Sequence, residues 1–173
     1  NNTAGGYNAM DAATTGIQNS ALGANALGAL TTGNNNVGLG VGAGGGTTTG
    51  GSNIAIGISA LASNTTSGQN IAAVGHNTMV ANTSGTYNVA VGAFALDANT
   101  TASNNTAVGY ASLGANTSGT QNTALGAFAL DANTTAANNT ALGFQALTST
   151  TTGAGNVAVG AGAMTLSTGQ RNA

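Results

Sequence analysis

The sequence predicts an all-β fold, a parallel β-solenoid of about ten coils with 17 residues each. Three observations predict it. A short motif recurs at a fixed interval along the whole chain, glycine and turn-forming residues recur at the same places within it, and only one or two apolar positions persist in each copy. A short repeat of this kind is typical of a solenoid, in which each coil is stable only when stacked on the next.

The motif N-x-A-x-G defines the repeat, and its asparagine is position one. The copies are 17 residues apart, except for 18 after Asn70, where we assign one alanine of the Ala72–Ala73 pair as the extra residue. The ten copies predict a single repeat array over residues 1–173. Because the last residues restart the motif and the first is not Met, we expect an excerpt of a longer chain. The motif begins at Asn2, Asn19, Asn36, Asn53, Asn70, Asn88, Asn105, Asn122, Asn139 and Asn156.

Each coil is predicted to contain two short strands and a return loop. Positions two to four are often aliphatic or β-branched, which favours a strand. Glycine at position five permits a sharp turn or close backbone packing. Positions six to nine are predicted as a second strand, and the polar positions ten to seventeen as the loop. Helical solenoids use units of 30 or more residues, so the short unit favours β-coils.

The aliphatic side chains at positions four and nine are predicted to form the coil core. Small residues, mostly alanine, at positions three and eight are predicted to leave smooth surfaces that pack against another chain. The predicted core residues are Leu22, Ile56, Val74, Val91, Val108, Leu125, Leu142, Val159, Leu61, Leu96, Leu113, Leu130 and Leu147. The predicted turn glycines are Gly23, Gly57, Gly92, Gly109, Gly126, Gly143 and Gly160.

Composition argues against several classes of function. The formal charge is −2 with one arginine and no lysine, so no basic surface for nucleic acid is expected. No apolar run is long enough for a membrane-spanning helix, so no membrane insertion is expected. Cysteine is absent, which excludes disulfides and thiolate metal sites.

Few residues could support chemistry, and we predict no catalytic, cofactor-binding or metal-binding residue. His76 is the only histidine and has no acidic neighbour in the sequence, so a structural role is expected. Asp11, Asp97 and Asp131 all occupy position ten and are expected at one solvated edge. The glycine-rich residues 41–46 are not followed by lysine and indicate no phosphate loop. The chain is therefore predicted not to be an enzyme.

Position thirteen is threonine in every copy, which predicts a stacked threonine column. Such a flat rank of hydroxyls could order water, so an ice-binding protein is one alternative. The other interpretation is that threonine suits exposed β-corners. The column is Thr14, Thr31, Thr48, Thr65, Thr83, Thr100, Thr117, Thr134, Thr151 and Thr168.

The same segments contain the N-x-S/T triplet, which accepts N-linked glycans in exported proteins. Five triplets begin at position twelve and predict a glycosylated edge, although such triplets also arise by chance in an Asn- and Thr-rich repeat. The predicted glycosylation sites are Asn64, Asn82, Asn99, Asn116 and Asn133, with further triplets at Asn1, Asn104 and Asn138.

The segments NVAVGAFAL, NIAIGISAL, NTALGFQAL and NTAVGYASL resemble the head repeats of trimeric autotransporter adhesins and similar repeats of trimeric tail-fibre proteins. The resemblance covers nearly the whole chain through a short, degenerate motif. It implies a left-handed parallel β-roll, a trimer of chains side by side, and a stiff or adhesive surface fibre. The chain departs from the adhesin pattern in its longer unit, its Leu or Met at position nine and its constant threonine at position thirteen.

These observations predict a non-catalytic, extracellular structural or adhesive segment: an adhesin head, a tail-fibre shaft or a subunit of a filament. We expect it on a cell or virion surface, without a cofactor. The expected partners are further copies of the chain, in a trimer or filament, and a host-surface glycan or protein. The alternatives are ice binding through the threonine column and a lectin-like adhesin. Contacts in an adhesin are expected from positions six and seven, including Phe94, Tyr110, Phe128 and Phe144.

Overall fold

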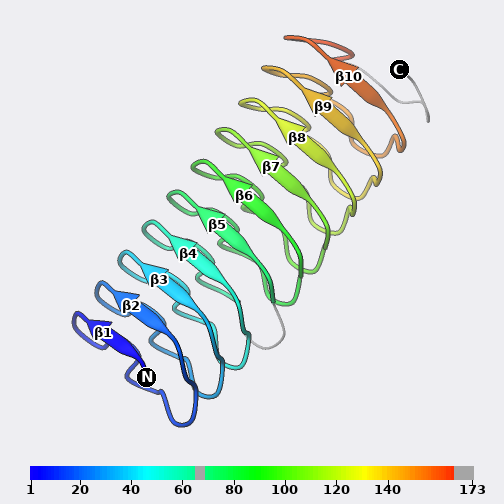
Figure 1. Cartoon of the computed structure of the whole chain (residues 1–173). Coiled ribbons are helices and arrows are strands. Elements are labelled where there is room, and N and C mark those ends of the chain that lie inside the picture. The colour runs from blue at the N-terminus through cyan, green and yellow to red at the C-terminus, as the bar shows by residue number, and fades with distance from the viewer. Residues whose placement is uncertain (65–68, 166–173) are drawn as a thin grey trace.

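The computed structural model describes residues 1–64 and 69–165 and is a β-solenoid, as predicted. Each coil contributes one strand of three residues, and the strands stack in chain order into one parallel ten-stranded sheet (Figure 1). The strands are β1 (Thr3–Gly5), β2 (Ser20–Leu22), β3 (Val37–Leu39), β4 (Ile54–Ile56), β5 (Ala72–Val74), β6 (Val89–Val91), β7 (Thr106–Val108), β8 (Thr123–Leu125), β9 (Thr140–Leu142) and β10 (Val157–Val159).

The strands pair in constant register, and this register corrects the sequence alignment of the fifth coil. Ala72 pairs with Ile54 and Ala73 with Ala55, so neither alanine is extra. Ile71, and not Asn70, occupies position one, because its N–H donates to the Asn53 side chain as the asparagines of other coils do. The 18-residue interval therefore lies between Asn53 and Ile71. An insertion in the connecting loop preserves the strand register, whereas one inside β5 would shift it.

The middle residue of each strand is position three of the repeat, and its side chain points into the coil. The side chains at positions two and four of the repeat, at the two ends of the strand, point outward. This alternation is the ordinary pleat of a strand. Apart from Ala4 in the terminal strand β1, the alanines at position three, such as Ala107 and Ala124, are buried. Position three is therefore interior and does not form the smooth outer surface that we predicted. The interior between facing positions three and eight is narrow, and small side chains fit there.

The predicted core at position four is wrong for the single chain. Leu22 is 61% exposed and Val159 is 67% exposed. None of the position-four residues that we predicted as core is buried, because the pleat turns them to the outer side of the sheet. These residues are Leu22, Ile56, Val74, Val91, Val108, Leu125, Leu142 and Val159.

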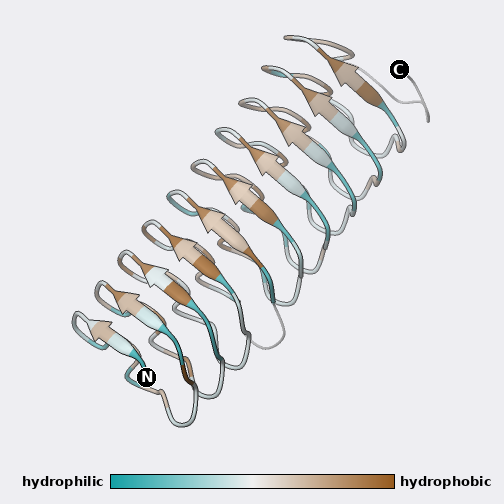
Figure 2. Cartoon of the chain, viewed as in Figure 1, coloured by the Kyte–Doolittle hydropathy of each residue, from teal (hydrophilic) through white to brown (hydrophobic). Residues whose placement is uncertain are grey.

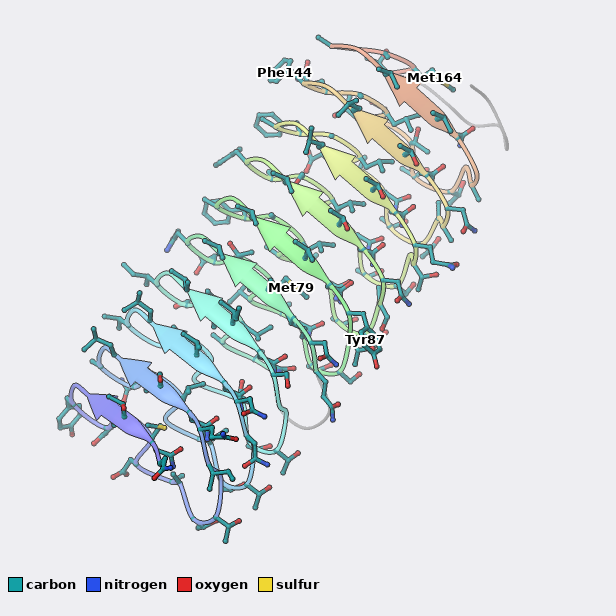
Figure 3. The ribbon with its side chains drawn as sticks, viewed as in Figure 1. Met79, Tyr87, Phe144 and Met164 are labelled. Carbon is teal, nitrogen blue, oxygen red and sulfur yellow. The ribbon has the colours of Figure 1, made fainter. Side chains whose placement is uncertain are left out.

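The predicted core at position nine is confirmed. The leucines of this column are buried in the coil, packed with the alanines of positions three and eight. Met79 belongs to the same column and lies within the stack (Figure 3). The confirmed core residues, each 0% exposed, are Leu61, Leu96, Leu113, Leu130 and Leu147.

Positions six to nine do not form the predicted second strand in the described coils. Positions seven and nine lie in the left-handed region, for example Ala111 with φ 51° and Leu113 with φ 52°. Alternating left-handed residues make a series of turns rather than an extended segment. The backbone still bonds between coils, because the Ala111 N–H donates to the Ala93 carbonyl and the Leu113 N–H to the Ala129 carbonyl, at 3.0 and 2.9 Å.

The predicted turn glycines are confirmed. Gly109 has φ 131°, and a Cβ placed on it would lie 2.6 Å from the carbonyl carbon of Gly126 in the next coil. Glycine is therefore required both by its conformation and by the close approach of the next backbone. The predicted glycines with positive φ are Gly23, Gly57, Gly92, Gly109, Gly126, Gly143 and Gly160.

The asparagines at position one form a buried column that replaces a hydrophobic core on this side of the coil. Asn122 is 0% exposed. Its Oδ1 accepts the N–H of Asn139 in the next coil at 3.0 Å, and its Nδ2 donates to the Ala136 carbonyl across its own coil at 2.9 Å. Its own N–H donates to the Asn105 Oδ1 at 2.9 Å. Each side chain thus satisfies buried backbone groups in two coils.

A second buried asparagine column occupies position twelve. The Asn99 Nδ2 donates to the Asn82 Oδ1, and the Asn133 Nδ2 to the Asn116 Oδ1, both at 2.8 Å. The column ends at coil nine, where Thr150 replaces asparagine. The Asn133 Oδ1 and the Thr150 Oγ1 are both buried without a hydrogen-bond partner.

Replacing Thr150 with asparagine should extend this column by one rung. The new Nδ2 would donate to the Asn133 Oδ1, so the T150N variant should gain about 1–3 kcal/mol in free energy of unfolding. Thermal and urea unfolding measure the gain. T150V is the matched variant, because it removes the unpaired hydroxyl and leaves the Asn133 oxygen unsatisfied; it should be less stable than T150N. Equal stability of the two variants would contradict the expected bond.

Candidate binding faces

The outer sheet face, formed by positions two and four of β1–β10, is an exposed aliphatic surface. Figure 2 shows hydrophobic residues at the ends of most strands along the whole stack. A hollow of about 250 Å³ lies over β1, β2 and β3, where Gly5 provides no side chain at position four and Leu22 borders the gap. The exposed apolar residues of this face are Leu22, Val37, Leu39, Ile54, Val89, Val91, Leu125, Leu142, Val157 and Val159.

A row of five aromatic rings, which we term the aromatic ladder, runs over coils five to nine beside this face. It comprises His76, Phe94, Tyr110, Phe128 and Phe144. The centroids of successive rings are 5.4, 5.8, 5.2 and 6.3 Å apart, with interplanar angles between 71° and 87°. These are edge-to-face contacts, the favoured geometry of aromatic pairs.

The ladder alternates between two positions of the repeat. His76, Tyr110 and Phe144 are at position six, whereas Phe94 and Phe128 are at position seven, which is left-handed with φ 60° and 58°. Tyr110 and Phe144 are half exposed, and Figure 3 shows Phe144 at the corner that follows the strand. Each coil contributes one ring, and the residue that carries it alternates between position six and position seven from one coil to the next. Successive rings therefore contact each other edge to face.

Sequence reasoning identified these aromatic residues individually but missed the ladder. The signal was present, because the segments NVAVGAFAL and NTALGAFAL recur after 34 residues with a different copy between them. This double period is the alternation of the rings. His76 is the first rung and contacts Phe94, so its expected structural role agrees with its place in the fold.

The aspartates at position ten do not all gather at one site. Asp97 and Asp131 lie on either side of Gly114, whose missing side chain leaves room for both; a Cβ there would lie 2.8 Å from the Asp131 Oδ1 and 3.5 Å from the Asp97 Oδ1. Partial burial raises the pKa of both carboxyls above the usual value, and the charge of Asp97 raises the pKa of Asp131 further. Asp11 is exposed in the first coil. Within residues 1–64 and 69–165, no group of three or more potential ligands could hold a metal ion.

The threonine column uses its hydroxyls within the stack. The Thr83 Oγ1 donates to the Thr100 carbonyl at 3.1 Å, and the Thr117 Oγ1 to the Thr134 carbonyl at 3.1 Å. The same bond joins Thr31 to Thr48. The geometry therefore favours the structural interpretation of the column, as a ladder between coils. Thr65 and Thr168 lie outside the described residues.

The predicted glycosylation edge is wrong for the five asparagines at position twelve. Asn64, Asn82, Asn99, Asn116 and Asn133 are at most 1% exposed and form the second buried column. A glycan on any of these amides would occupy the space of the neighbouring coil. Sequence reasoning placed them outside because polar residues are mostly exposed, but here the amides satisfy backbone groups. The triplets at Asn1, Asn104 and Asn138 begin at exposed residues instead.

None of the described segments is a helix long and apolar enough to span a membrane. No protein-family model, curated protein or solved structure matches the chain.

Proposed function

We propose that the chain is a non-catalytic rod, a segment of an extracellular fibre that associates with copies of itself through the outer sheet face. The observation that carries this proposal is the uninterrupted stack of coils from β1 to β10. At a strand spacing of about 4.8 Å, ten strands make a rod roughly 43 Å long. The resemblance of the repeats to adhesin heads and tail fibres supports a place on a cell or virion surface.

The described side chains support a mechanical role better than a chemical one. The only histidine is held in a ring contact, and the two neighbouring aspartates have no third ligand or basic partner in the described part of the chain. The polar groups at positions one, twelve and thirteen bond from coil to coil. These residues hold the backbone in place, and this is the chemistry that a stiff spacer requires.

Self-association is supported by the outer sheet face. Leu125, Leu142 and Val91 are between 38% and 45% exposed, and aliphatic residues of this kind follow one another along the sheet. Exposed apolar surfaces of this kind mark interaction sites. Ten strands of three residues span roughly 450 Å², about half of the ~800 Å² that one partner contributes to a standard interface. The proposed interface therefore also includes the corner of the coil that precedes the strands, on the opposite side from the aromatic residues at positions six and seven.

Sedimentation velocity and light scattering test this proposal. The unmodified chain should be an oligomer, and substitution of Val91 and Leu125 with lysine should give a monomer with unchanged circular dichroism. The matched control replaces Thr101 and Thr135, which are exposed but lie off the sheet, with lysine and should remain an oligomer. A monomeric unmodified chain at high protein concentration would refute association through this face. Negative-stain microscopy distinguishes a filament from a closed oligomer.

A further inference from the structure

We infer that the aromatic ladder binds an extended, neutral, β-1,4-linked glycan that lies along the axis of the rod. The inference does not depend on self-association. The ladder is partly open to solvent, because Tyr110 is 50% exposed and Phe144 is 52% exposed. Aromatic rings in such a row offer flat apolar surfaces against which the C–H faces of pyranose rings pack.

The spacing of the ladder agrees with the spacing of such a glycan. One ring occurs per coil, and rings of the same type of position recur every second coil, at about 10 Å along the stack. A β-1,4-linked chain also alternates, because each pyranose is turned by about half a turn relative to the one before. The length of its two-sugar repeat is close to the distance that two coils span along the stack. Because neighbouring rings are nearly perpendicular, only alternate rungs can turn a face toward the glycan. The five rungs therefore provide face contacts for about every second sugar and edge contacts for the sugars between them.

The surroundings of the ladder favour an uncharged ligand with many hydroxyl groups. Two of the coils with a ring at position six have an amide at position seven, Asn77 beside His76 and Gln145 beside Phe144. Amides and the Tyr110 hydroxyl can both donate to and accept from sugar hydroxyls. The chain contains one arginine and one histidine in total, so it has no cluster of basic side chains to bind a polyanion.

Titration of the whole chain with cellohexaose and with chitohexaose tests the inference. Calorimetry should detect binding of at least one of the two, and proton NMR should show that the ring resonances of Tyr110 shift while those of Tyr87 do not. Y110S should weaken the affinity about tenfold, as expected for loss of a central aromatic contact. Y110F keeps the ring and should retain affinity within about twofold of the unmodified chain.

Tyr87 offers a matched control, because it is 59% exposed and lies at the opposite corner of the coil, away from the ladder (Figure 3). Y87S should bind as the unmodified chain does, and so should the lysine variant of Val91 and Leu125, which separates this inference from self-association. The inference is overturned if neither hexasaccharide binds at millimolar concentration, or if Y87S loses as much affinity as Y110S. Binding of a protein to the ladder without glycan binding would also overturn it.

Discussion

Replacing Gly109 with alanine should lower the free energy of unfolding by at least about 3 kcal/mol, from backbone strain and overlap together. Gly109 has φ 131°, a conformation that is strained for an L-residue. Its new methyl group would also lie 2.6 Å from the carbonyl carbon of Gly126, well inside van der Waals contact. Since the backbone fixes the position of the Cβ and the Gly126 carbonyl is itself backbone, neither can move without opening the stack. Urea unfolding followed by circular dichroism measures the loss.

Gly160 provides the control for this substitution. It has nearly the same conformation, with φ 124°, but the nearest described atom to its added Cβ would be the Ala163 Cβ at 3.9 Å. Gly160→Ala should therefore cost only the strain of the conformation, about 1–3 kcal/mol. The difference between the two variants measures the backbone contact between coils. If both variants lost the same free energy, close stacking at Gly109 would not be the cause.

Replacing Asn122 with leucine should cost about 1–3 kcal/mol, because it leaves the buried Asn139 N–H unpaired. The Asn139 N–H would lose its acceptor, whereas the Ala136 carbonyl would lose one of two donors and keep the Asn133 Nδ2 at 3.2 Å. The loss is measured by thermal unfolding, and hydrogen exchange of the Asn139 amide should accelerate selectively.

A neighbouring exposed residue is the comparison for this second substitution. Thr123→Leu adds an apolar side chain on the outer sheet face and should change stability by less than about 0.5 kcal/mol. Ile71 shows that the column tolerates an apolar residue where the preceding coil carries an insertion. A cost of Asn122→Leu no larger than that of Thr123→Leu would mean that the column contributes shape rather than hydrogen bonding.

The repeat was sufficient to predict the solenoid, because residues at a constant interval must stack when each interval is one coil. It was also sufficient for Gly109 and Leu113, since only glycine tolerates the turn and the large aliphatic column must be buried. Which face of each strand points into the coil was not predictable in the same way. In a strand of three residues such as Thr106–Val108, the most hydrophobic side chain, that of Val108, is at the end, and its hydropathy led to the prediction that this side chain is buried, whereas the middle alanine is the buried one.

Two further features escaped prediction for different physical reasons. Asn116 was placed outside because polar side chains favour water, whereas its amide is buried and bonds to Asn99 and to the Gly119 carbonyl. The ladder depends on residues one position apart in alternate coils, so a column-by-column alignment separates Phe128 from Tyr110. Contacts between positions become visible only when the coils are placed in space.

The side-chain amides of the two asparagine columns all share one orientation, with oxygen toward the C-terminal coils and the bonded N–H on the following coil. Aligned dipoles of this kind add rather than cancel. The rod is therefore polar, because its N-terminal and C-terminal ends present different hydrogen-bonding groups. Any longer fibre made by continuing this stack would be polar, and a partner that binds its N-terminal end would not bind its C-terminal end.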